Sequence, residues 1–305
     1  MIELKGIELN YLKPILKGIH LQVKRGEILG LVGKSGAGKS SLLKICAGLQ
    51  DPDAGQIVID GKPQTAVRNL LVPGYAGLAI VNQDFKLDPY HTVEENLREA
   101  ILHWPYAKRD KRVQKLLRLF GLKDISSTKA HLISGGEQQR VAIARAIADQ
   151  PAYLLLDEPF GHLDAHLRQK LSAHLMDLRD EENTGIILVS HEGQDVLGLC
   201  DHICILQNGK LSKKYQPEEV YYHYKAPERA RLFGPLNTLK IKEELVHFRP
   251  DEYIIASNGI EVYFEKALFV GGLYLNYMKS AHQERILLYA FEKLTEIKAI
   301  EIRKK

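Results

Sequence analysis

The stretch that decides the fold of this 305-residue chain is Gly33-Lys34-Ser35-Gly36-Ala37-Gly38-Lys39-Ser40. It fits the pattern G-x-x-x-x-G-K-[ST], in which glycines let the backbone wrap closely around phosphate groups. A buried-type run, residues 28–32, precedes the stretch and a helical pattern follows it, and this context separates a phosphate-binding loop from a chance match. We therefore expect a bound nucleotide whose β- and γ-phosphates are reached by Lys39, with the Ser40 hydroxyl on Mg²⁺.

A second apolar run ends in two carboxylates. Residues 153–156 read Tyr-Leu-Leu-Leu, and Asp157 and Glu158 follow them directly. Ligands of parallel sheets bind at the carboxyl ends of the strands. We expect Asp157 to hold Mg²⁺ through water, and Glu158 to orient or deprotonate the water that attacks the nucleotide. The alternative is that the two carboxylates only cap a helix.

The composition is that of a globular protein. Lys and Arg number 42 against 38 Asp and Glu, and no dense basic run indicates a nucleic-acid partner. No stretch approaches about 18 consecutive apolar residues, so no segment is expected to span a bilayer. Residues 1–5 lack the pattern of a secretory signal. The three cysteines, Cys46, Cys200 and Cys204, are too few for a disulfide framework or a zinc site and fit a reducing cytosol.

Strands alternate with helices over the first two thirds of the chain. This alternation predicts an α/β fold with a mostly parallel sheet, and the alternating runs 2–9 and 19–23 predict an antiparallel edge. Residues 92–120 follow a helical period. The basic side chains in that stretch are expected to form one solvated helix face: Lys108, Arg109, Lys111, Arg112, Lys115 and Arg118.

The last third of the chain has a different character. Proline and glycine punctuate residues 217–237, which indicates a junction, and the runs beyond are rich in Tyr, Phe, Ile and Val. The pair Asn258-Gly259 between two such runs is typical of a β-hairpin. We expect a nucleotide-binding domain over residues 1–237 and a small, separable all-β module over residues 238–305.

The residues between the two phosphate elements resemble the ATP-binding cassette (ABC) family, and the resemblance covers residues 1 to about 235. The run Ser134-Gly135-Gly136-Glu137 resembles the family signature, and the residues after it resemble the signature helix. Four single residues are similar to family positions: Gln83 to the Q-loop glutamine, Asp164 to the D-loop aspartate, His191 to the switch histidine and Tyr11 to the adenine-stacking aromatic.

The resemblance implies a P-loop ATPase core with a helical subdomain, followed by the small all-β module. It implies that Glu158, His191 and Gln83 are catalytic and that Ser40, Gln83 and Asp157 hold Mg²⁺. It implies that ATP is bound by Tyr11, Gly33, Lys34, Ser35, Gly36, Ala37, Gly38, Lys39, Ser40, Ser41, Ser134, Gly135, Gly136, Glu137 and Asp164. From the residues alone, Ser134-Gly135-Gly136 opens a helix and offers a second anion-binding end.

The two anion-binding ends bear on assembly. The resemblance implies that the signature of one subunit closes over ATP held by another, which gives a head-to-tail homodimer with two nucleotides. The family signature commonly reads Leu-Ser-Gly-Gly-Gln, whereas this chain has Ile133 and Glu137 at its ends. Glu137 adds a negative charge near a phosphate site, and we expect it to affect the rate of hydrolysis or of closure.

The segment from Pro217 to Asn237 resembles the one that leads importer ATPases into a C-terminal β-module with a regulatory or dimerising role. The resemblance therefore implies the ATPase subunit of an importer, peripheral on the cytoplasmic face of the membrane. Its partners would be permease subunits and a solute-binding protein. Two alternatives stay open: a soluble ATP-switched assembly protein without a permease, and the ATPase of an exporter with separate membrane subunits.

Overall fold

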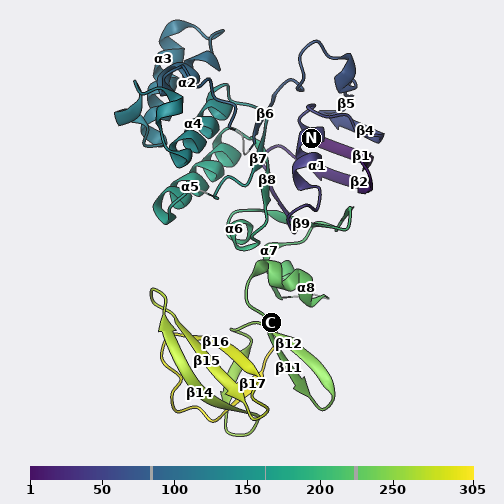
Figure 1. Cartoon of the computed structure of the whole chain (residues 1–305), viewed down its shortest axis with the longest axis vertical. Coiled ribbons are helices and arrows are strands. Elements are labelled where there is room, and N and C mark those ends of the chain that lie inside the picture. The colour runs from purple at the N-terminus through teal and green to yellow at the C-terminus, as the bar shows by residue number, and fades with distance from the viewer. Residues whose placement is uncertain (83–84, 162, 223–225) are drawn as a thin grey trace. The chain divides into compact units, whose positions relative to one another are not determined.

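The computed structural model describes residues 1–82, 85–161, 163–222 and 226–305 (Figure 1). The chain separates into two compact units, Met1–Pro217 and Glu218–Lys305. The sequence predicts a boundary at residue 237, whereas the structure assigns the segment 218–237 to the C-terminal unit.

A buried arginine explains why the segment 218–237 belongs to the C-terminal unit. The Arg249 side chain is fully buried and donates hydrogen bonds to the carbonyl oxygens of Tyr221, Ala230, Gly234 and Pro235, at 2.8, 2.9, 3.1 and 3.0 Å. Its guanidinium carbon lies 4.1 Å from the centroid of the Tyr221 ring. A buried cation that satisfies four carbonyl groups of one segment fixes that segment to its own unit.

A six-stranded sheet forms the core of Met1–Pro217, in the order β10-β9-β3-β8-β7-β6. Five of its strands run parallel, and β10 is antiparallel to β9. The strands are β3 (Ile28–Val32), β6 (Leu78–Val81), β7 (Tyr153–Asp157), β8 (Gly185–Ser190), β9 (His202–Gln207) and β10 (Lys210–Leu211). All residues of β3, β7 and β8 are buried, as expected for parallel strands covered on both faces. The predicted mostly parallel α/β sheet is confirmed.

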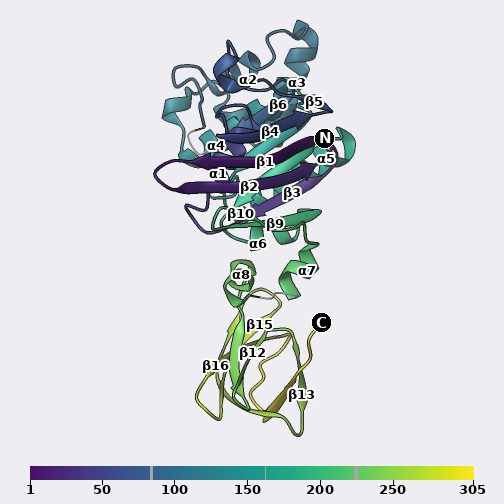
Figure 2. The same cartoon turned by 90° about the vertical axis from the view of Figure 1, so that its right-hand side faces the viewer.

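A four-stranded antiparallel sheet, in the order β2-β1-β4-β5, packs with helix α1 (Lys39–Cys46). Its strands are β1 (Ile2–Asn10), β2 (Pro14–Val23), β4 (Ala54–Ile59) and β5 (Lys62–Pro63). Ile2, Leu4, Ile7 and Leu9 of β1 join the cluster of buried side chains that also contains Leu29 and Leu42, and a register shift between Leu4 and Ile7 interrupts their alternation. Figure 2 shows this sheet in front of the parallel strands. The antiparallel edge predicted from the alternating runs is confirmed.

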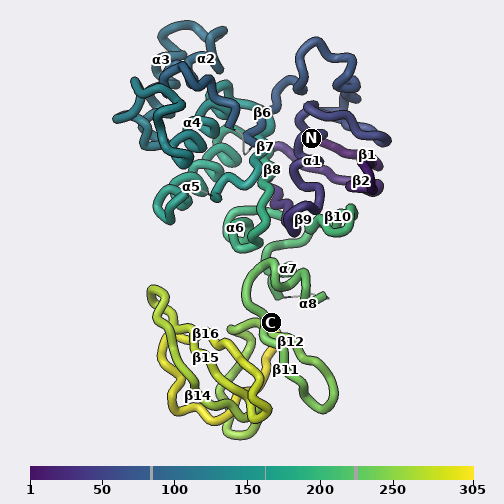
Figure 3. Tube along the Cα trace, in the orientation of Figure 1, coloured from purple at the N-terminus to yellow at the C-terminus, as the bar shows by residue number. Residues whose placement is uncertain are grey.

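The longer helices that follow β6 in the chain lie on the other side of β6–β8 from α1, as the trace in Figure 3 shows. They are α2 (Val93–Glu99), α3 (Tyr106–Leu119), α4 (Gly135–Ala148) and α5 (Ala165–Glu181). The short helices of this unit are η1 (Val67–Asn69), η2 (Lys123–Ile125), η3 (Ala130–Leu132) and α6 (Gln194–Leu197). The helical region predicted over residues 92–120 is thus two helices, α2 and α3.

One of the six basic residues predicted to be solvated is buried. Arg112 of α3 donates hydrogen bonds to the carbonyl oxygens of Ile147 (2.6 Å) and Ala148 (3.2 Å), the last residues of α4. The last carbonyls of a helix have no partner within it, and a buried guanidinium can supply one. The prediction of a fully solvated basic face is therefore wrong at Arg112, which joins α3 to α4.

The C-terminal unit is a small β-rich module, as predicted. It begins with α7 (Pro217–Tyr222), α8 (Pro227–Ala230) and η4 (Arg231–Phe233), and continues with the paired strands β11 (Asn237–Ile241) and β12 (Glu244–Phe248). A five-stranded antiparallel sheet follows, in the order β13-β17-β14-β15-β16. Its strands are β13 (Tyr253–Ala256), β14 (Ile260–Phe269), β15 (Tyr274–Ser280), β16 (Arg285–Ala290) and β17 (Ala299–Ile302).

The predicted hairpin at Asn258-Gly259 is wrong. β13 and β14 do not pair with each other, because β17 lies between them and Ile300 is paired with both Ile255 and Ile260. A Cβ atom on Gly259 would lie 2.5 Å from the carbonyl oxygen of Ile300. The glycine thus allows β17 to pass close to the backbone, which is a different use of the residue from the turn that the sequence indicated.

A buried histidine on α5 gives folding stability a pH dependence. His174 is 7% exposed, and its ring meets the edge of Phe120 at a centroid distance of 5.6 Å. Burial lowers the pKa of His174 to about 4, whereas an unfolded histidine titrates near 6.5. Between these values the unfolded chain binds the extra proton, so stability should be lost as the pH falls from 6.5 to 4, by up to about 3 kcal/mol. Urea unfolding at pH 7.5 and pH 5 measures this loss, and His174→Leu should reduce it. An equal pH dependence in that variant would assign the loss to other groups.

Candidate functional site

The phosphate loop connects β3 to α1, and two of its glycines stand where a larger side chain would clash with neighbouring strands. A Cβ atom on Gly33 would lie 2.4 Å from the carbonyl oxygen of Leu206 in β9. Gly38, which precedes α1, has φ +99°, and a Cβ there would lie 2.9 Å from Cγ2 of Ile15. Larger residues at these two positions would force the neighbouring strands apart. The loop is therefore held tightly between β2 and β9.

Lys39 lies inside the curve of this loop. Its ammonium donates hydrogen bonds to the carbonyl oxygens of Gly33 (2.8 Å) and Lys34 (3.2 Å). Burial lowers the pKa of Lys39, and the nearby carboxylates of Glu158 and Asp157 act in the opposite direction. The loop thus holds a desolvated positive charge, which interacts more strongly with a phosphate group than a solvated one.

Asp157 is the last residue of β7 and is 8% exposed. Burial raises its pKa, and a hydrogen bond with the Ser40 side chain lowers it in part. Among the described residues, Oδ1 of Asp157 is buried and has no hydrogen-bond partner. A buried carboxylate oxygen without a partner is costly unless a cation or water completes it. Asp157 and Ser40 therefore supply oxygen atoms of the kind that magnesium prefers.

Glu158 and His191 come together at the ends of β7 and β8. The Glu158 backbone is left-handed, with φ +53°, and its N–H donates to the carbonyl oxygen of Val189 at 3.0 Å. The chain changes direction at this residue, after the end of β7. Oε1 of Glu158 lies 3.0 Å from Nδ1 of His191. Ser190 Oγ donates a hydrogen bond to the Asp195 carboxylate at 2.9 Å and accepts one from the backbone N–H of Glu192 at 3.0 Å. These two bonds fix the turn that carries His191.

These residues surround a cavity of about 460 Å³. Its lining consists of Tyr11, Ile15, Ser35, Gly36, Gly38, Lys39, Ser40, Ser41, Glu158 and His191. Tyr11 is 62% exposed, and its hydroxyl accepts a hydrogen bond from Gln50 at 2.8 Å. Ile15 carries no local signal in the sequence and was missed. Gln83, predicted for catalysis and for the metal, lies outside the described residues.

The predicted signature residues do not line this cavity. Ser134 caps α4, and its Oγ and N–H each donate to the Glu137 carboxylate at 2.8 Å, while the Glu137 N–H donates back to Ser134 Oγ. These bonds lower the pKa of Glu137. Gly135 and Gly136 form the first turn of α4, and Asp164 caps α5 by accepting the N–H of Leu167 at 2.9 Å. The two helix ends that the sequence predicts to bind anions therefore lie at different places in one chain.

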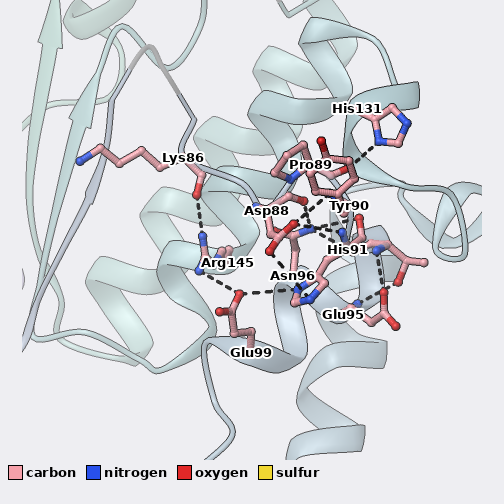
Figure 4. A network of polar contacts seen from close by, with 11 residues as sticks. Lys86, Asp88, Pro89, Tyr90, His91, Glu95, Asn96, Glu99, His131 and Arg145 are labelled. Carbon is pink, nitrogen blue, oxygen red and sulfur yellow. Dashed lines mark hydrogen bonds and ion pairs between the residues drawn. The ribbon is translucent and has the colours of Figure 1, made fainter.

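A polar network ties the segment just after Gln83 and Asp84 to the helices (Figure 4). Asn96 of α2 is fully buried, donates to the carbonyl oxygen of Asp88 at 3.1 Å and accepts the Asp88 N–H at 2.9 Å. Arg145 of α4 donates to the carbonyl oxygen of Lys86 (2.8 Å) and pairs with Glu99 (3.1 Å). The sequence does not predict this network, because Asn96 and Arg145 hold the segment 86–88 through its backbone atoms.

Known proteins resemble this chain in sequence and in fold. A family model described as ABC transporter matches residues 16–161. The curated sulfate/thiosulfate import ATP-binding protein CysA of Synechocystis sp. is 38% identical over 80% of this chain and 68% of its own length. The chain belongs to the ABC transporter family. The putrescine transport ATP-binding protein PotG of Escherichia coli is 33% identical over 79% of this ABC chain and 63% of its own length.

Solved ABC cassettes superpose on the chain. A dimeric ATP-binding cassette in a post-hydrolysis state, bound to ADP and Pi, has 28% sequence identity and a TM-score of 0.63, over 71% of this chain and 99% of its own. The predicted ABC ATPase fold, nucleotide binding and ATP hydrolysis are thereby confirmed for this cassette. Within the ranges that the structure describes, no helix has the length and apolar composition needed to cross a membrane.

Proposed function

We propose that this ABC cassette is the ATP-hydrolysing subunit of an importer and works as a homodimer with two nucleotides. One observation carries the proposal: Lys39, Glu158 and His191 share a cavity that the signature residues do not line. The site is then complete only when Ser134 of a second copy closes over it. The relatives named for the import of sulfate/thiosulfate and for putrescine transport support the transport role.

The residues of the cavity have distinct roles in this proposal. The loop amides and Lys39 bind the phosphates, and the exposed ring of Tyr11 stacks on adenine. Glu158 orients or deprotonates the attacking water, while His191, held 3.0 Å from Glu158, donates a hydrogen bond toward the γ-phosphate. Gln83 is proposed to join the catalytic and metal-binding residues.

The metal fits the same residues. Ser40 and Asp157 would hold Mg²⁺, because the hydroxyl lies beside the carboxylate and Asp157 Oδ1 has no partner within the described residues. When bound, the ion neutralises charge on the β- and γ-phosphates. The bond from Ser40 to Asp157 keeps the two side chains together before the nucleotide arrives.

The signature end of α4 would grip the nucleotide of the partner. The hydroxyl of Ser134 and the amides of Gly135 and Gly136 stand at a helix N-terminus, which favours an anion. The Glu137 carboxylate accepts hydrogen bonds from the Ser134 hydroxyl and N–H. A phosphate that binds to these two donors therefore has to displace the carboxylate. Asp164 is proposed to lie at the same subunit boundary.

Dimerisation should depend on ATP and on Ser134. The variant Glu158→Gln should form a dimer with ATP and stay a monomer with ADP, since only the γ-phosphate reaches the signature of a second chain. Adding Ser134→Arg should abolish the dimer and spare ATP binding, because it places bulk and charge where a short hydroxyl is needed. Light scattering gives the mass, and Ser127→Arg, at an exposed serine of the same helical region, is the control. Equal masses in ATP and ADP would contradict the proposal.

The transport role is tested by the partners of the full chain. We expect the chain to copurify with integral membrane permease subunits, which would hold it at the cytoplasmic face of the membrane. We expect a solute-binding protein loaded with its solute to raise the rate of ATP hydrolysis by the complex. Isolation on a soluble scaffold without a permease would favour the assembly-protein alternative. Movement of substrate outward through the reconstituted complex would favour an exporter.

A further inference from the structure

We infer that Gln139 is a positioning residue for Glu158, and that it joins the signature helix to the catalytic carboxylate of the same chain. The inference rests on the proposed role of Glu158 and adds a residue to it. Gln139 lies in the second turn of α4, five residues after the cap Ser134. Its side chain is 3% exposed and points at the backbone that follows β7.

The contact is made with the residue that carries the reacting carboxylate. Nε2 of Gln139 donates to the carbonyl oxygen of Glu158 at 3.2 Å and to that of Pro159 at 2.9 Å. Glu158 has the left-handed backbone, with φ +53°, that an L-residue with a side chain adopts at a cost. Such a conformation persists when its surroundings hold it in place, and Gln139 holds the carbonyl side of this residue.

The amide of Gln139 is poorly explained by stability alone. Its Oε1 is buried and has no hydrogen-bond partner among the described residues. A buried polar atom without a partner destabilises the folded state, and an apolar side chain of similar size would avoid this cost. The donor group therefore accounts for the presence of a glutamine, and within the described part of the chain it bonds to the carbonyls of Glu158 and Pro159.

Gln139 connects the helix that begins at Ser134 to the backbone of Glu158. Ser134 at the start of this helix is the residue that would bind the nucleotide of the partner, whereas Glu158 acts on the nucleotide of its own chain. A shift of α4 when the signature closes over a phosphate therefore reaches the Glu158 backbone through one side chain. Hydrolysis at one site thus depends on the seating of the signature helix that serves the other site.

Gln139→Leu tests the inference, because leucine keeps most of the volume and removes the donor. We expect kcat for ATP to fall about 10-fold, since a small displacement of a catalytic group costs one to two orders of magnitude in rate. We expect the ATP dissociation constant to change by less than about 2-fold, because Gln139 does not line the cavity. Phosphate release and titration with a fluorescent ATP analogue give the two quantities. Gln139→Met provides a second, more flexible side chain of similar length if the leucine variant melts at a lower temperature.

Gln138→Leu is the matched control. Gln138 is the next residue of the same helix and also donates to two carbonyls, those of Ala130 (2.9 Å) and Ile133 (3.4 Å), which belong to the helical region and not to the β7 end. This variant should keep kcat within about 2-fold of the original chain. An equal fall in kcat for both variants would reduce Gln139 to a general role in helix packing and overturn the inference.

A double variant separates this inference from the proposed function. If Gln139 acts through Glu158, then adding Gln139→Leu to Glu158→Gln should leave the residual single-turnover rate unchanged. A further 10-fold fall in the double variant would show that Gln139 acts on another group and would overturn the inference alone. Normal turnover in Glu158→Gln itself would instead overturn the role of Glu158.

Discussion

Replacing Glu158 by glutamine is expected to lower ATP turnover by about 10²- to 10⁴-fold and to leave ATP binding intact. The amide keeps the size of the side chain and cannot accept a proton from water. Glu158 lines the cavity together with Lys39 and lies 3.0 Å from His191, so the loss falls on the chemical step. Phosphate release under saturating ATP measures turnover, and calorimetric titration measures binding.

The control for this experiment is Glu192→Gln. Glu192 is an exposed carboxylate 3.9 Å from the other ring nitrogen of His191, so its replacement removes the same charge beside the same imidazole. We expect this variant to keep turnover within about 2-fold of the original chain, as exposed ion pairs are weak. Near-normal phosphate release from Glu158→Gln would show that another group activates the water.

Replacing Lys39 by alanine is expected to weaken ATP binding by about 10²-fold or more, the scale of losing one partner of a buried charge pair. The β- and γ-phosphates would lose a desolvated ammonium, and the carbonyls of Gly33 and Lys34 would lose their donor. The variant thus removes a positive charge of the loop and also two hydrogen bonds that hold the loop backbone. Calorimetric titration with ATP measures the affinity.

Lys44→Ala is the matched control for the loop lysine. Lys44 lies in the last turn of the same helix, α1, and is exposed to solvent, so its removal changes the net charge equally without touching the loop. We expect its ATP affinity to stay within about 2-fold of the original. Unchanged affinity in Lys39→Ala would contradict the assignment of the phosphate loop.

The parts of the fold that the sequence predicts are those with local signals. The phosphate loop has a fixed spacing between a buried run and a helix, and β7 is a continuous apolar run that ends in carboxylates. Parallel strands that are buried on both faces produce such runs wherever they occur. The family resemblance then adds residues that are distant in sequence, such as His191, which the structure places beside Glu158.

The parts that the sequence does not predict depend on long-range partners. In the sequence, Arg112 is one of several cations on a basic helix. Only the structure shows that its guanidinium binds a carbonyl oxygen at the end of α4. Arg249 and Gln139 bind backbone carbonyls, and a carbonyl group is present at every position of the chain, so no residue type marks the partner. The boundary between the units and the positioning of Glu158 therefore become visible only in three dimensions.

The strand order of the C-terminal module has a consequence for synthesis on the ribosome. β13 has β17 as its neighbour, and β17 is the last strand of the chain, made more than forty residues after β13. While residues 257–298 are being translated, β13 has no strand to pair with and its backbone donors and acceptors face water. The hairpins β14–β15 and β15–β16 can form as they emerge, but the sheet closes only after Ile300 has left the exit tunnel. A premature stop before Ala299 would therefore remove an interior strand and leave β13 as an unpaired edge open to aggregation.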